Sequence, residues 1–519
     1  MNIKELVLTP AEAFDEALFI PALYKKLAIT RAGNRVVVPV KRSVDARGRN
    51  IVVRVQYEIV ERANIPPRRT KDYPSVHNKE PIVIIGSGPA GLFAALRLIE
   101  LGYKPIVLER GKDVQARRYD LAAINKEQVV NPDSNYCFGE GGAGTYSDGK
   151  LYTRSKKRGD VQRIMEILVA HGAKEDILFD AHPHIGTNKL PKLVAELRES
   201  IKQAGGEVHF ETRVTDFVLD GNKIKGVRTQ HGDVIEGRAT ILATGHSARD
   251  IFRLLNDKKI LIEAKPFALG ARVEHRQSLI DSIQYHCQDE RGAYLPAAAY
   301  ALVHQAKIDG KAKGVFSFCM CPGGFIVPAA TAPGELVVNG MSPSQRNARF
   351  ANSGIVVAVD ENDYQHLQRF GALAAMEFQA EVERNAWDVA GKSQVAPAQR
   401  LVDFVNDKKS STSLDTSYHP GLIAADMRAF LPPFITDALR QGFQSFGQKM
   451  PGYLTNDAQI IGVESRTSSP VRIPRDKVSL QHPQIANLFP CGEGAGYAGG
   501  IVSAAMDGER CAEAAVRSE

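Results

Sequence analysis

The chain has 519 residues, of which 44% are hydrophobic and 24% charged, values typical of a globular protein with two or three domains. No apolar run approaches the ~20 residues of a membrane span. The six scattered cysteines are too few for a disulfide framework. The net charge of +7 is modest, so neither a membrane nor a nucleic acid is an expected partner. The N-terminus MNIKELVLTP has no apolar signal core, which predicts a cytoplasmic protein; the oligomeric state stays open.

Residues 1–62 predict a small α+β domain. Thr9-Pro-Ala-Glu12 is a capping box that opens a helix running towards Ile20, and Pro21 should interrupt or end that helix. Residues 36–40 are a strand candidate with an internal proline, which favours a position at the edge of a sheet. Residues 51–60 predict a clearer strand with alternating apolar positions.

A polar loop, Lys41-Arg-Ser-Val-Asp-Ala-Arg47, should join these two strands. It could contact a phosphate or RNA. The favoured interpretation is a solvated turn with Asp45 paired to a neighbouring arginine, because charged runs on loops are usually solvated. Residues 63–80 contain Pro66-Pro67-Arg68-Arg69 without periodicity and therefore predict a linker.

The stretch 81–100, PIVIIGSGPAGLFAALRLIE, is the element around which the chain is organised. A short β-branched run leads into Gly86-x-Gly88-x-x-Gly91 and then an apolar helix. The first glycine permits a tight turn, the second lets backbone approach a pyrophosphate at the helix N-terminus, and the third lets the helix pack on the strand. Glu109 ends the next predicted strand, where its carboxylate can accept hydrogen bonds from a ribose diol. This combination predicts a dinucleotide site.

Three later segments decide between FAD and NAD. The first is the stretch 137–150, CFGEGGAGTYSDGK, whose glycines give a backbone able to lie flat against a ligand. The second is a β-meander over residues 208–240, preceded by an amphipathic helix over 189–204 and followed by a strand ending in Ala-Thr-Gly at 243–245. After it, Ser247 should cap the following helix.

The third segment closes the chain. Gly492-Glu493 places a carboxylate at the end of a strand, suited to a sugar-alcohol hydroxyl. Gly499-Gly500 then opens the last helix with uncapped N–H groups, which could stabilise negative charge at the N1/C2=O edge of a reduced flavin.

The region between these segments, residues 258–475, mixes strands, prolines and helix candidates at 372–385 and 435–446, without a second GxGxxG. The predicted fold is therefore α/β: a Rossmann-like FAD-binding domain with a parallel sheet and a β-meander (residues 81–257 and 476–519). An α+β cap domain interrupts it, and the small N-terminal α+β domain precedes it.

With these signatures in order, the chain resembles flavoproteins of the glutathione-reductase-like FAD superfamily. It resembles more closely a bacterial family of uncharacterised FAD-dependent dehydrogenases, in Lys41–Arg47, Gly139–Lys150, His184–Thr187, Phe318–Gly324, Arg466–Ile473 and Gly492–Gly500. The resemblance implies that FAD is held by Gly86, Ser87, Gly88, Gly91 and Glu109, with Glu493 on the ribitol. The other residues expected to contact FAD lie in the same segments: Pro89, Ala90, Arg110, Gly141, Gly142, Gly144, Thr145, Val214, Ala243, Thr244, Gly245, Gly492, Gly499, Gly500 and Ile501.

Three features are candidates for the chemistry. Cys319-Met-Cys321 could be half of a zinc site, a strained redox dithiol, or a buried turn whose cysteines pack as small hydrophobes; the last is favoured, and no metal site is predicted. One of these thiols could still be a proton donor or nucleophile. His246 should lie near the cofactor, because it follows Ala-Thr-Gly. Arg466 and Arg472 could bind a substrate carboxylate or the FAD pyrophosphate, or form a salt bridge between cap and core.

The leading functional prediction is an FAD-dependent oxidoreductase. Hydride would pass between flavin N5 and either a small-molecule substrate or NAD(P)H. Two alternatives stay open: a flavin-containing RNA- or tRNA-binding protein that uses Lys41–Arg47 and Arg68-Arg69, and a redox-sensing flavoprotein without turnover.

Overall fold

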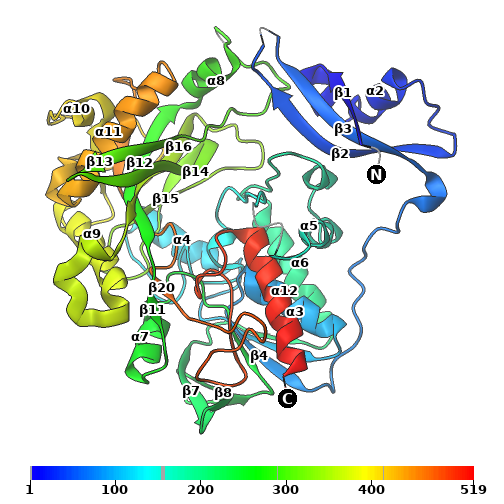
Figure 1. The fold of residues 1–519 in the computed structure, drawn as a ribbon, viewed down its shortest axis with the longest axis vertical. Helices are drawn as coiled ribbons and strands as arrows, with labels where there is room; N and C mark the ends of the chain where they lie inside the picture. The colour runs from blue at the N-terminus through cyan, green and yellow to red at the C-terminus, as the bar shows by residue number, and fades with distance from the viewer. Residues whose placement is uncertain (1–2, 49, 154–157, 289, 413, 519) are drawn as a thin grey trace.

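The computed structural model describes residues 3–518 apart from residues 49, 154–157, 289 and 413. At its centre lies a parallel sheet with the strand order β21-β10-β4-β5-β6 (Figure 1). Its strands are β4 (Pro81–Ile85), β5 (Lys104–Leu108), β6 (Glu207–His209), β10 (Thr240–Leu242) and β21 (Leu488–Pro490). Because β10 pairs with β4 on one side and with β21 on the other, the C-terminal segment returns to the sheet that contains the first glycine turn.

Helices cover one face of this sheet. They are α3 (Pro89–Glu100), α5 (Val161–Ala170), α6 (Leu190–Gln203) and α12 (Ile501–Arg517), and α3 and α12 lie side by side (Figure 1). A Cβ on Gly508 of α12 would lie 2.1 Å from the carbonyl oxygen of Ala90, so a side chain there would force these two helices apart. The opposite face packs against α7 (Arg249–Asp257) and the predicted meander of β7 (Val214–Asp220), β8 (Lys223–Thr229) and β9 (Val234–Glu236).

A second, mostly antiparallel sheet forms the cap, in the order β13-β14-β16-β12-β19-β17-β18, with β15 paired to β14. The strands are β12 (Phe267–Arg276), β13 (Val303–Ile308), β14 (Lys311–Pro328), β15 (Val338–Met341), β16 (Phe350–Val359), β17 (Ala396–Arg400), β18 (Leu422–Ala424) and β19 (Gln459–Glu464). The cap helices are α8 (Gln277–Tyr285), α9 (Ala374–Val389), α10 (Leu401–Val405) and α11 (Pro433–Lys449), of which α9 and α11 match the two predicted helices. Where the chain enters and leaves the cap, β11 (Glu263–Ala264) pairs with β20 (Val471–Arg472).

The N-terminal residues form a separate antiparallel sheet in the order β1-β3-β2 (Figure 1). Its elements are β1 (Lys4–Leu8), α1 (Pro10–Phe14), α2 (Phe19–Lys26), β2 (Arg35–Asp45) and β3 (Val52–Glu61). As predicted, β2 is an edge strand, and its register shifts just after Pro39, which lacks the N–H needed for regular pairing.

Two predictions for this region are wrong. The helix opened by the Thr9 capping box ends at Phe14, because the Asp15 side chain then accepts hydrogen bonds from the backbone N–H groups of Ala17 and Leu18. Pro21 lies in the first turn of the next helix, where the absent N–H costs nothing. The predicted polar loop is largely strand, since Lys41 to Asp45 continue β2 in register with β3.

Arg42 anchors the N-terminal sheet to the central part of the molecule. Its buried guanidinium donates to Asp180 and Asp176 at 2.7 and 3.1 Å, and it lies about 5 Å from the ring centres of three phenylalanines. Arg47, by contrast, is exposed and pairs with Asp45 at 2.8 Å, as the favoured interpretation expected.

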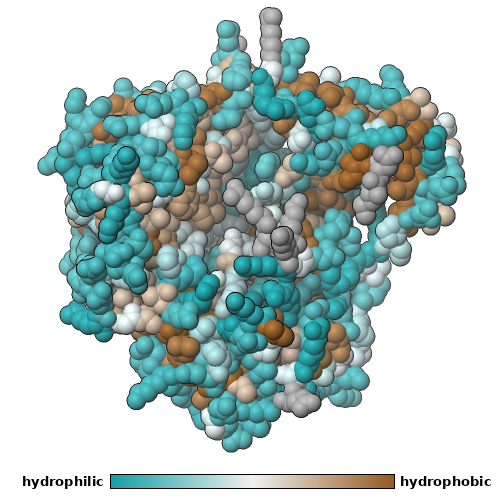
Figure 2. Space-filling view, in the orientation of Figure 1, coloured by the Kyte–Doolittle hydropathy of each residue, from teal (hydrophilic) through white to brown (hydrophobic). Residues whose placement is uncertain are grey.

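The remaining described elements are α4 (Arg117–Lys126), short 3₁₀ turns at Arg62–Asn64, Gly142–Gly144, Glu175–Leu178 and Met427–Ala429, and a longer, kinked 3₁₀ segment at Glu361–Leu373. Among the described residues, no helix combines the length and the apolar character that a membrane crossing requires. Hydrophilic side chains cover most of the face in Figure 2, and the surface is hollowed between the N-terminal sheet and the cap.

Candidate functional site

A cavity of about 330 Å³ extends from the carboxyl ends of β4, β5 and β10 to the cap. Parallel α/β sheets bind ligands at this edge, because the helix N-termini and the loops between strands and helices meet there. The glycine turn after β4, the N-terminus of α12 and a strand of the cap all contribute to its wall.

The three glycines of the first turn have different physical roles. Gly86 has φ +103°, and a Cβ there would lie 2.4 Å from the carbonyl oxygen of Ala243. A Cβ on Gly91 would lie 1.9 Å from the carbonyl oxygen of Gly86. A Cβ on Gly88 would meet nothing within 4 Å. Gly86 and Gly91 therefore close the turn, whereas Gly88 leaves space on the cavity side for a ligand.

The glycine-rich stretch predicted to contact the cofactor lies against this turn. A Cβ on Gly142 would lie 3.2 Å from the Cα of Gly88. The stretch is fixed from behind by Arg117, which is fully buried and donates to the carbonyl oxygens of Asn135, Glu140 and Gly142 at 2.8 to 3.0 Å. This buried cation escaped the sequence analysis, because nothing in its local pattern distinguishes it from a surface arginine of a helix.

Glu109, predicted to bind a ribose, also has a structural role. One carboxylate oxygen accepts from the backbone N–H and the hydroxyl of Ser87 at 3.0 and 2.7 Å. The other accepts from the N–H groups of Gly111 and Gly139 at 2.9 and 3.0 Å. Glu109 thus joins the turn after β4 to the glycine-rich stretch, and its role towards a ribose stays a prediction.

Arg110 and Val214 line the same end of the cavity. The Arg110 guanidinium lies 4.3 Å from the ring centre of Phe138 and pairs with Asp133 and Asp250, each at 2.9 Å. This stacked and paired arginine offers a flat surface beside an apolar wall, which suits an aromatic base.

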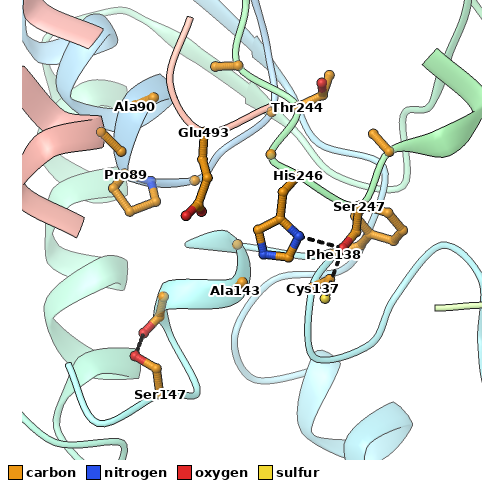
Figure 3. A pocket seen from close by; sticks show the side chains of 18 of the residues that line it. Pro89, Ala90, Cys137, Phe138, Ala143, Ser147, Thr244, His246, Ser247 and Glu493 are labelled. Carbon is orange, nitrogen blue, oxygen red and sulfur yellow. Dashed lines mark hydrogen bonds between the residues drawn. The ribbon is translucent and has the colours of Figure 1, made fainter. Parts of the chain in front are cut away.

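The other end of the cavity carries the features expected around a flavin. Gly245, Gly499 and Gly500 line it, and a Cβ on any of them would meet nothing within 4 Å. The side chain of Glu493 points into this space, as does that of His246 (Figure 3). Burial raises the pKa of Glu493 to about 7, an effect that Lys265 opposes. A carboxyl group held in this way suits a hydrogen bond with a sugar-alcohol hydroxyl.

The lining fits FAD on two further observations. The buried hydroxyl of Thr244 lines the cavity and has no hydrogen-bond partner among the described residues, so a bound ligand could supply one. The N-termini of α3 and α12 both open on the cavity without a side-chain cap, which leaves N–H groups for a diphosphate and for the flavin edge.

Most residues predicted to contact the cofactor line this cavity. They are Gly86, Gly88, Pro89, Ala90, Glu109, Arg110, Gly142, Gly144, Val214, Ala243, Thr244, Gly245, Glu493, Gly499, Gly500 and Ile501. The others lie one layer behind and support the wall: Ser87, Gly91, Gly141, Thr145 and Gly492. The predicted cofactor residues that line the cavity form one wall of it, which we call the cradle.

The side chain of His246 belongs to a short polar chain on the cavity wall (Figure 3). Its Nδ1 lies 2.8 Å from the hydroxyl of Ser247, which lies 3.5 Å from the sulfur of Cys137. Ser247 does not cap α7 as predicted, because the N-cap position is Ala248 and no side chain caps it. Burial, together with the charge of Arg466, lowers the pKa of His246 to about 4, so the imidazole is neutral at pH 7.

Facing the cradle is the cap wall, formed by Phe318, Cys319, Cys321, Asn339 and Gly340. Strand β14 buckles here: its register with β16 shifts on both sides of Cys321, and Cys319 takes φ +43°. As a result Cys319 is exposed to the cavity, whereas Cys321 is buried with its thiol donating to the Cys319 carbonyl at 3.2 Å. Partial desolvation by the cavity wall raises the pKa of the Cys319 thiol to about 11, an effect that the charge of Lys150 opposes.

A buried ion pair fixes the cap wall from behind. Arg272 and Glu464 contact each other with fully buried side chains. Arg272 also donates to the carbonyl of Cys319 at 2.7 Å and to Asn352 at 2.7 Å. The buckled conformation of β14 is therefore held by hydrogen bonds from a buried guanidinium.

The two arginines considered for substrate binding differ in their position relative to the cavity. Arg466 lines the cavity, but its guanidinium pairs with Glu383 at 2.7 Å and Glu335 at 3.1 Å. Arg249 of α7 pairs with the same two carboxylates, so Arg466 belongs to a buried cluster joining cap and core, which was the alternative interpretation. Within this cluster burial opposes ionisation, yet the two arginines hold the pKa of Glu383 at about 2. Arg472 lies outside the cavity lining, beside Tyr497.

A group of possible metal ligands lies behind the cradle. Cys491, Asp507 and Cys511 bring their ligand atoms within 4.8 Å of one another. Arg475 occupies this place, because it donates to both Asp507 oxygens at 2.9 and 2.6 Å and to Cys511 at 3.2 Å. The group is therefore a buried hydrogen-bond cluster that supports the last strand.

The chain matches known families over most of its length. Residues 79–243 match "FAD binding domain", residues 182–306 match "FAD dependent oxidoreductase", and residues 266–467 match "FAD-dependent protein, C-terminal domain-like". Residues 2–60 match a domain of unknown function (DUF8436).

Individual proteins and solved structures are also similar to this chain. An uncharacterized protein of Clostridium beijerinckii is 38% identical over 509 residues, which are 94% of each chain. A digeranylgeranylglycerophospholipid reductase of Picrophilus torridus is 24% identical over 221 residues, 42% of this chain and 51% of that protein. The crystal structure of CtdE in complex with FAD superposes with a TM-score of 0.32 at 11% identity, covering 85% of this chain and 84% of that chain.

The Rossmann-like fold, the cradle and the family matches define an FAD-dependent oxidoreductase, with FAD as its cofactor. Within that class, the chain belongs to the same family of FAD-dependent proteins as the Clostridium beijerinckii protein.

Proposed function

We propose that this oxidoreductase is a dehydrogenase or reductase that moves a hydride between FAD and a small-molecule substrate, with NAD(P)H as a possible electron donor. The observation that carries the proposal is the continuity of one cavity from the cradle to the cap wall. A substrate entering at the cap would meet the cofactor without any movement of the central sheet.

The cradle would hold the cofactor through main-chain groups. The N–H groups at the start of α3 suit the diphosphate, those at the start of α12 suit the flavin edge, and Glu493 suits the ribityl chain. FAD, when bound, supplies two-electron chemistry at flavin N5.

The side chains around the cavity would hold protons and exclude water. The Cys319 thiol keeps its proton at neutral pH, because its pKa is raised to about 11, so Sγ can donate a proton to a substrate atom. His246 is neutral under the same conditions, and a ring nitrogen can accept one. Phe318 adds an apolar surface to the cap wall.

Anaerobic photometry of the purified protein tests the proposal. Addition of NADH, NADPH or a reducing metabolite should bleach the flavin absorbance, and an oxidised substrate should restore it without oxygen. Oxygen consumption coupled to hydroxylation of the substrate would instead identify a monooxygenase. A flavin that no donor reduces would favour a redox-sensing protein without turnover.

The proposed partner is a small molecule, and nucleic-acid binding is not expected. The arginines considered for RNA each pair with a carboxylate: Arg42 with Asp180, Arg47 with Asp45, Arg68 with Glu175, and Arg69 with Glu100. Paired cations release few counterions on contact with a phosphate backbone. An RNA mobility shift that survives the loss of all four arginines would show binding elsewhere.

A further inference from the structure

The cap end of the cavity contains a cation that the sequence analysis did not single out. Lys150, the last residue of the glycine-rich stretch, lines the cavity together with Cys319. Its ammonium group donates to the carbonyl oxygen of Met320, the residue that follows Cys319. The two side chains come from segments about 170 positions apart in the chain, so only the fold brings them together.

Two cations share one carboxylate at this place. Arg346 binds both oxygens of the buried Asp148 at 3.0 and 2.5 Å, whereas Lys150 lies 3.8 Å from the same carboxylate. His184, nearby, is neutral because burial and the charge of Arg346 lower its pKa to about 4. Among the described residues, this group therefore carries one positive charge in excess at the cavity wall.

The described ion pairs behind and beside the cap wall are balanced. Arg272 pairs with Glu464, and in the buried cluster two arginines face two carboxylates. An ammonium group has three N–H donors, and one of those of Lys150 is used on Met320. Excess positive charge, remaining donor capacity and an exposed face on the cavity are the properties of an anion site.

We propose that Lys150 binds a carboxylate at the cap end of the cavity and holds it next to the thiol of Cys319. The substrate of the oxidoreductase is then a small carboxylic acid. That the bound acid is a substrate rests on the proposed function, whereas the carboxylate site itself does not. A single excess charge suits a monoanion, and Phe318, which lines the same cavity, offers an apolar surface for the carbon chain of the acid.

Alkylation of Cys319 reports on this site without turnover. Iodoacetate and iodoacetamide are similar in size and differ in charge. In each reaction the thiolate sulfur displaces iodide, so that a C–S bond forms, a C–I bond breaks and the thiol proton passes to the buffer. The FAD-loaded protein is treated at pH 8.5, and the modification of each cysteine is followed by peptide mass spectrometry. Cys287, half-buried and outside the cavity lining, is the internal reference.

We expect the iodoacetate-to-iodoacetamide rate ratio at Cys319 to exceed that at Cys287 by roughly fivefold or more, the size expected for a partly screened contact between unit charges. Lys150→Gln should bring the two ratios together, and Lys150→Arg should retain the difference. Propionate should slow the reaction of Cys319 with iodoacetate, whereas propionamide should not. Flavin absorbance and melting temperature check that each variant is folded and loaded.

Three results would overturn the proposal: equal ratios at the two cysteines, a preference that Lys150→Gln leaves unchanged, or a Cys319 that neither reagent reaches while Cys287 reacts. If Lys150→Gln shifts the flavin absorption spectrum of the substrate-free protein but not the labelling ratio, Lys150 serves the cofactor and the carboxylate site is refuted. None of these results depends on whether NAD(P)H or a metabolite reduces the flavin. The labelling experiment therefore tests the carboxylate site, and the photometry tests the proposed function separately.

Discussion

The cradle and the cap wall enclose the same cavity but are built on different principles. The cradle is made of main chain: glycines allow close approach, and helix N-termini supply N–H groups. The cap wall is made of side chains that a buckled strand and the buried Arg272–Glu464 pair hold in place. Local sequence motifs encode the first kind of surface, whereas tertiary packing creates the second. Substitutions should therefore separate cofactor binding from the integrity of the cap.

The largest effect is expected at the ion pair behind the cap wall. Arg272→Met should lower the free energy of unfolding by about 3–5 kcal/mol, because it leaves the Glu464 carboxylate buried without a partner. Urea denaturation measures the loss, and a titration with FAD should show unchanged affinity. The double variant Arg272→Met/Glu464→Leu should be less destabilised. An equal loss in single and double variants would contradict this account of the cap wall.

Gly88 of the cradle and Gly91, one layer behind it, provide a matched pair. Gly91→Ala should destabilise the protein by about 2–4 kcal/mol with or without FAD, because its Cβ would lie 1.9 Å from a backbone oxygen. Gly88→Ala should change the stability of the apoprotein by less than about 1 kcal/mol, since its Cβ meets nothing within 4 Å.

For cofactor affinity the order is reversed, and the larger effect is expected in Gly88→Ala. The methyl group of Gly88→Ala would occupy the space left for the diphosphate, so FAD should bind at least about tenfold more weakly. Fluorescence titration of the apoprotein with FAD gives this number. Unchanged affinity in Gly88→Ala would mean that the diphosphate lies elsewhere.

A smaller effect is expected at Glu493 and should depend on pH. Burial raises its pKa to about 7 from a usual 4.5, so between these values the folded apoprotein binds more protons than the unfolded chain. Stability should consequently fall as the pH rises from 5 to 8, by roughly 1–3 kcal/mol relative to Glu493→Gln. Melting curves of both apoproteins at several pH values test this, and parallel pH profiles would refute the shifted pKa.

The smallest effect is expected at Arg47. Its guanidinium is exposed and, among the described residues, pairs only with Asp45. Arg47→Ala should leave the melting temperature, the FAD content and the flavin reduction rate unchanged, because exposed ion pairs contribute little. A clear loss in any of the three would assign a function to this surface.

The same contrast explains how far the sequence could predict the molecule. Strand, glycine turn and helix at residues 81–100 follow from local sterics, and the structure reproduces them. The cofactor segments were identifiable for the same reason. Cys319 was named as a candidate, but its exposure to the cavity depends on a register shift and on Arg272, 47 positions away.

Other deviations have equally specific causes. Pro21 was expected to interrupt or end a helix, but a proline fits the first turn of a new one, and Asp15 provides the break. Lys41 continues a strand because the neighbouring strand β3 pairs with it. Lys150 lines the cavity and contacts Met320, a residue about 170 positions away in the chain. At Lys41 and Lys150 a partner more distant in sequence decides the outcome, whereas the break before Pro21 is made locally by Asp15.

The central claim is that two segments about 410 positions apart, at Gly88 and at Gly499, form one FAD site. Gly499→Ala tests it most directly, because its φ is compatible with alanine and its Cβ would meet nothing within 4 Å. A titration of the apoprotein with FAD should show roughly tenfold weaker binding than in the unaltered protein, at an unchanged melting temperature. Affinity equal to that of the unaltered protein would contradict the claim.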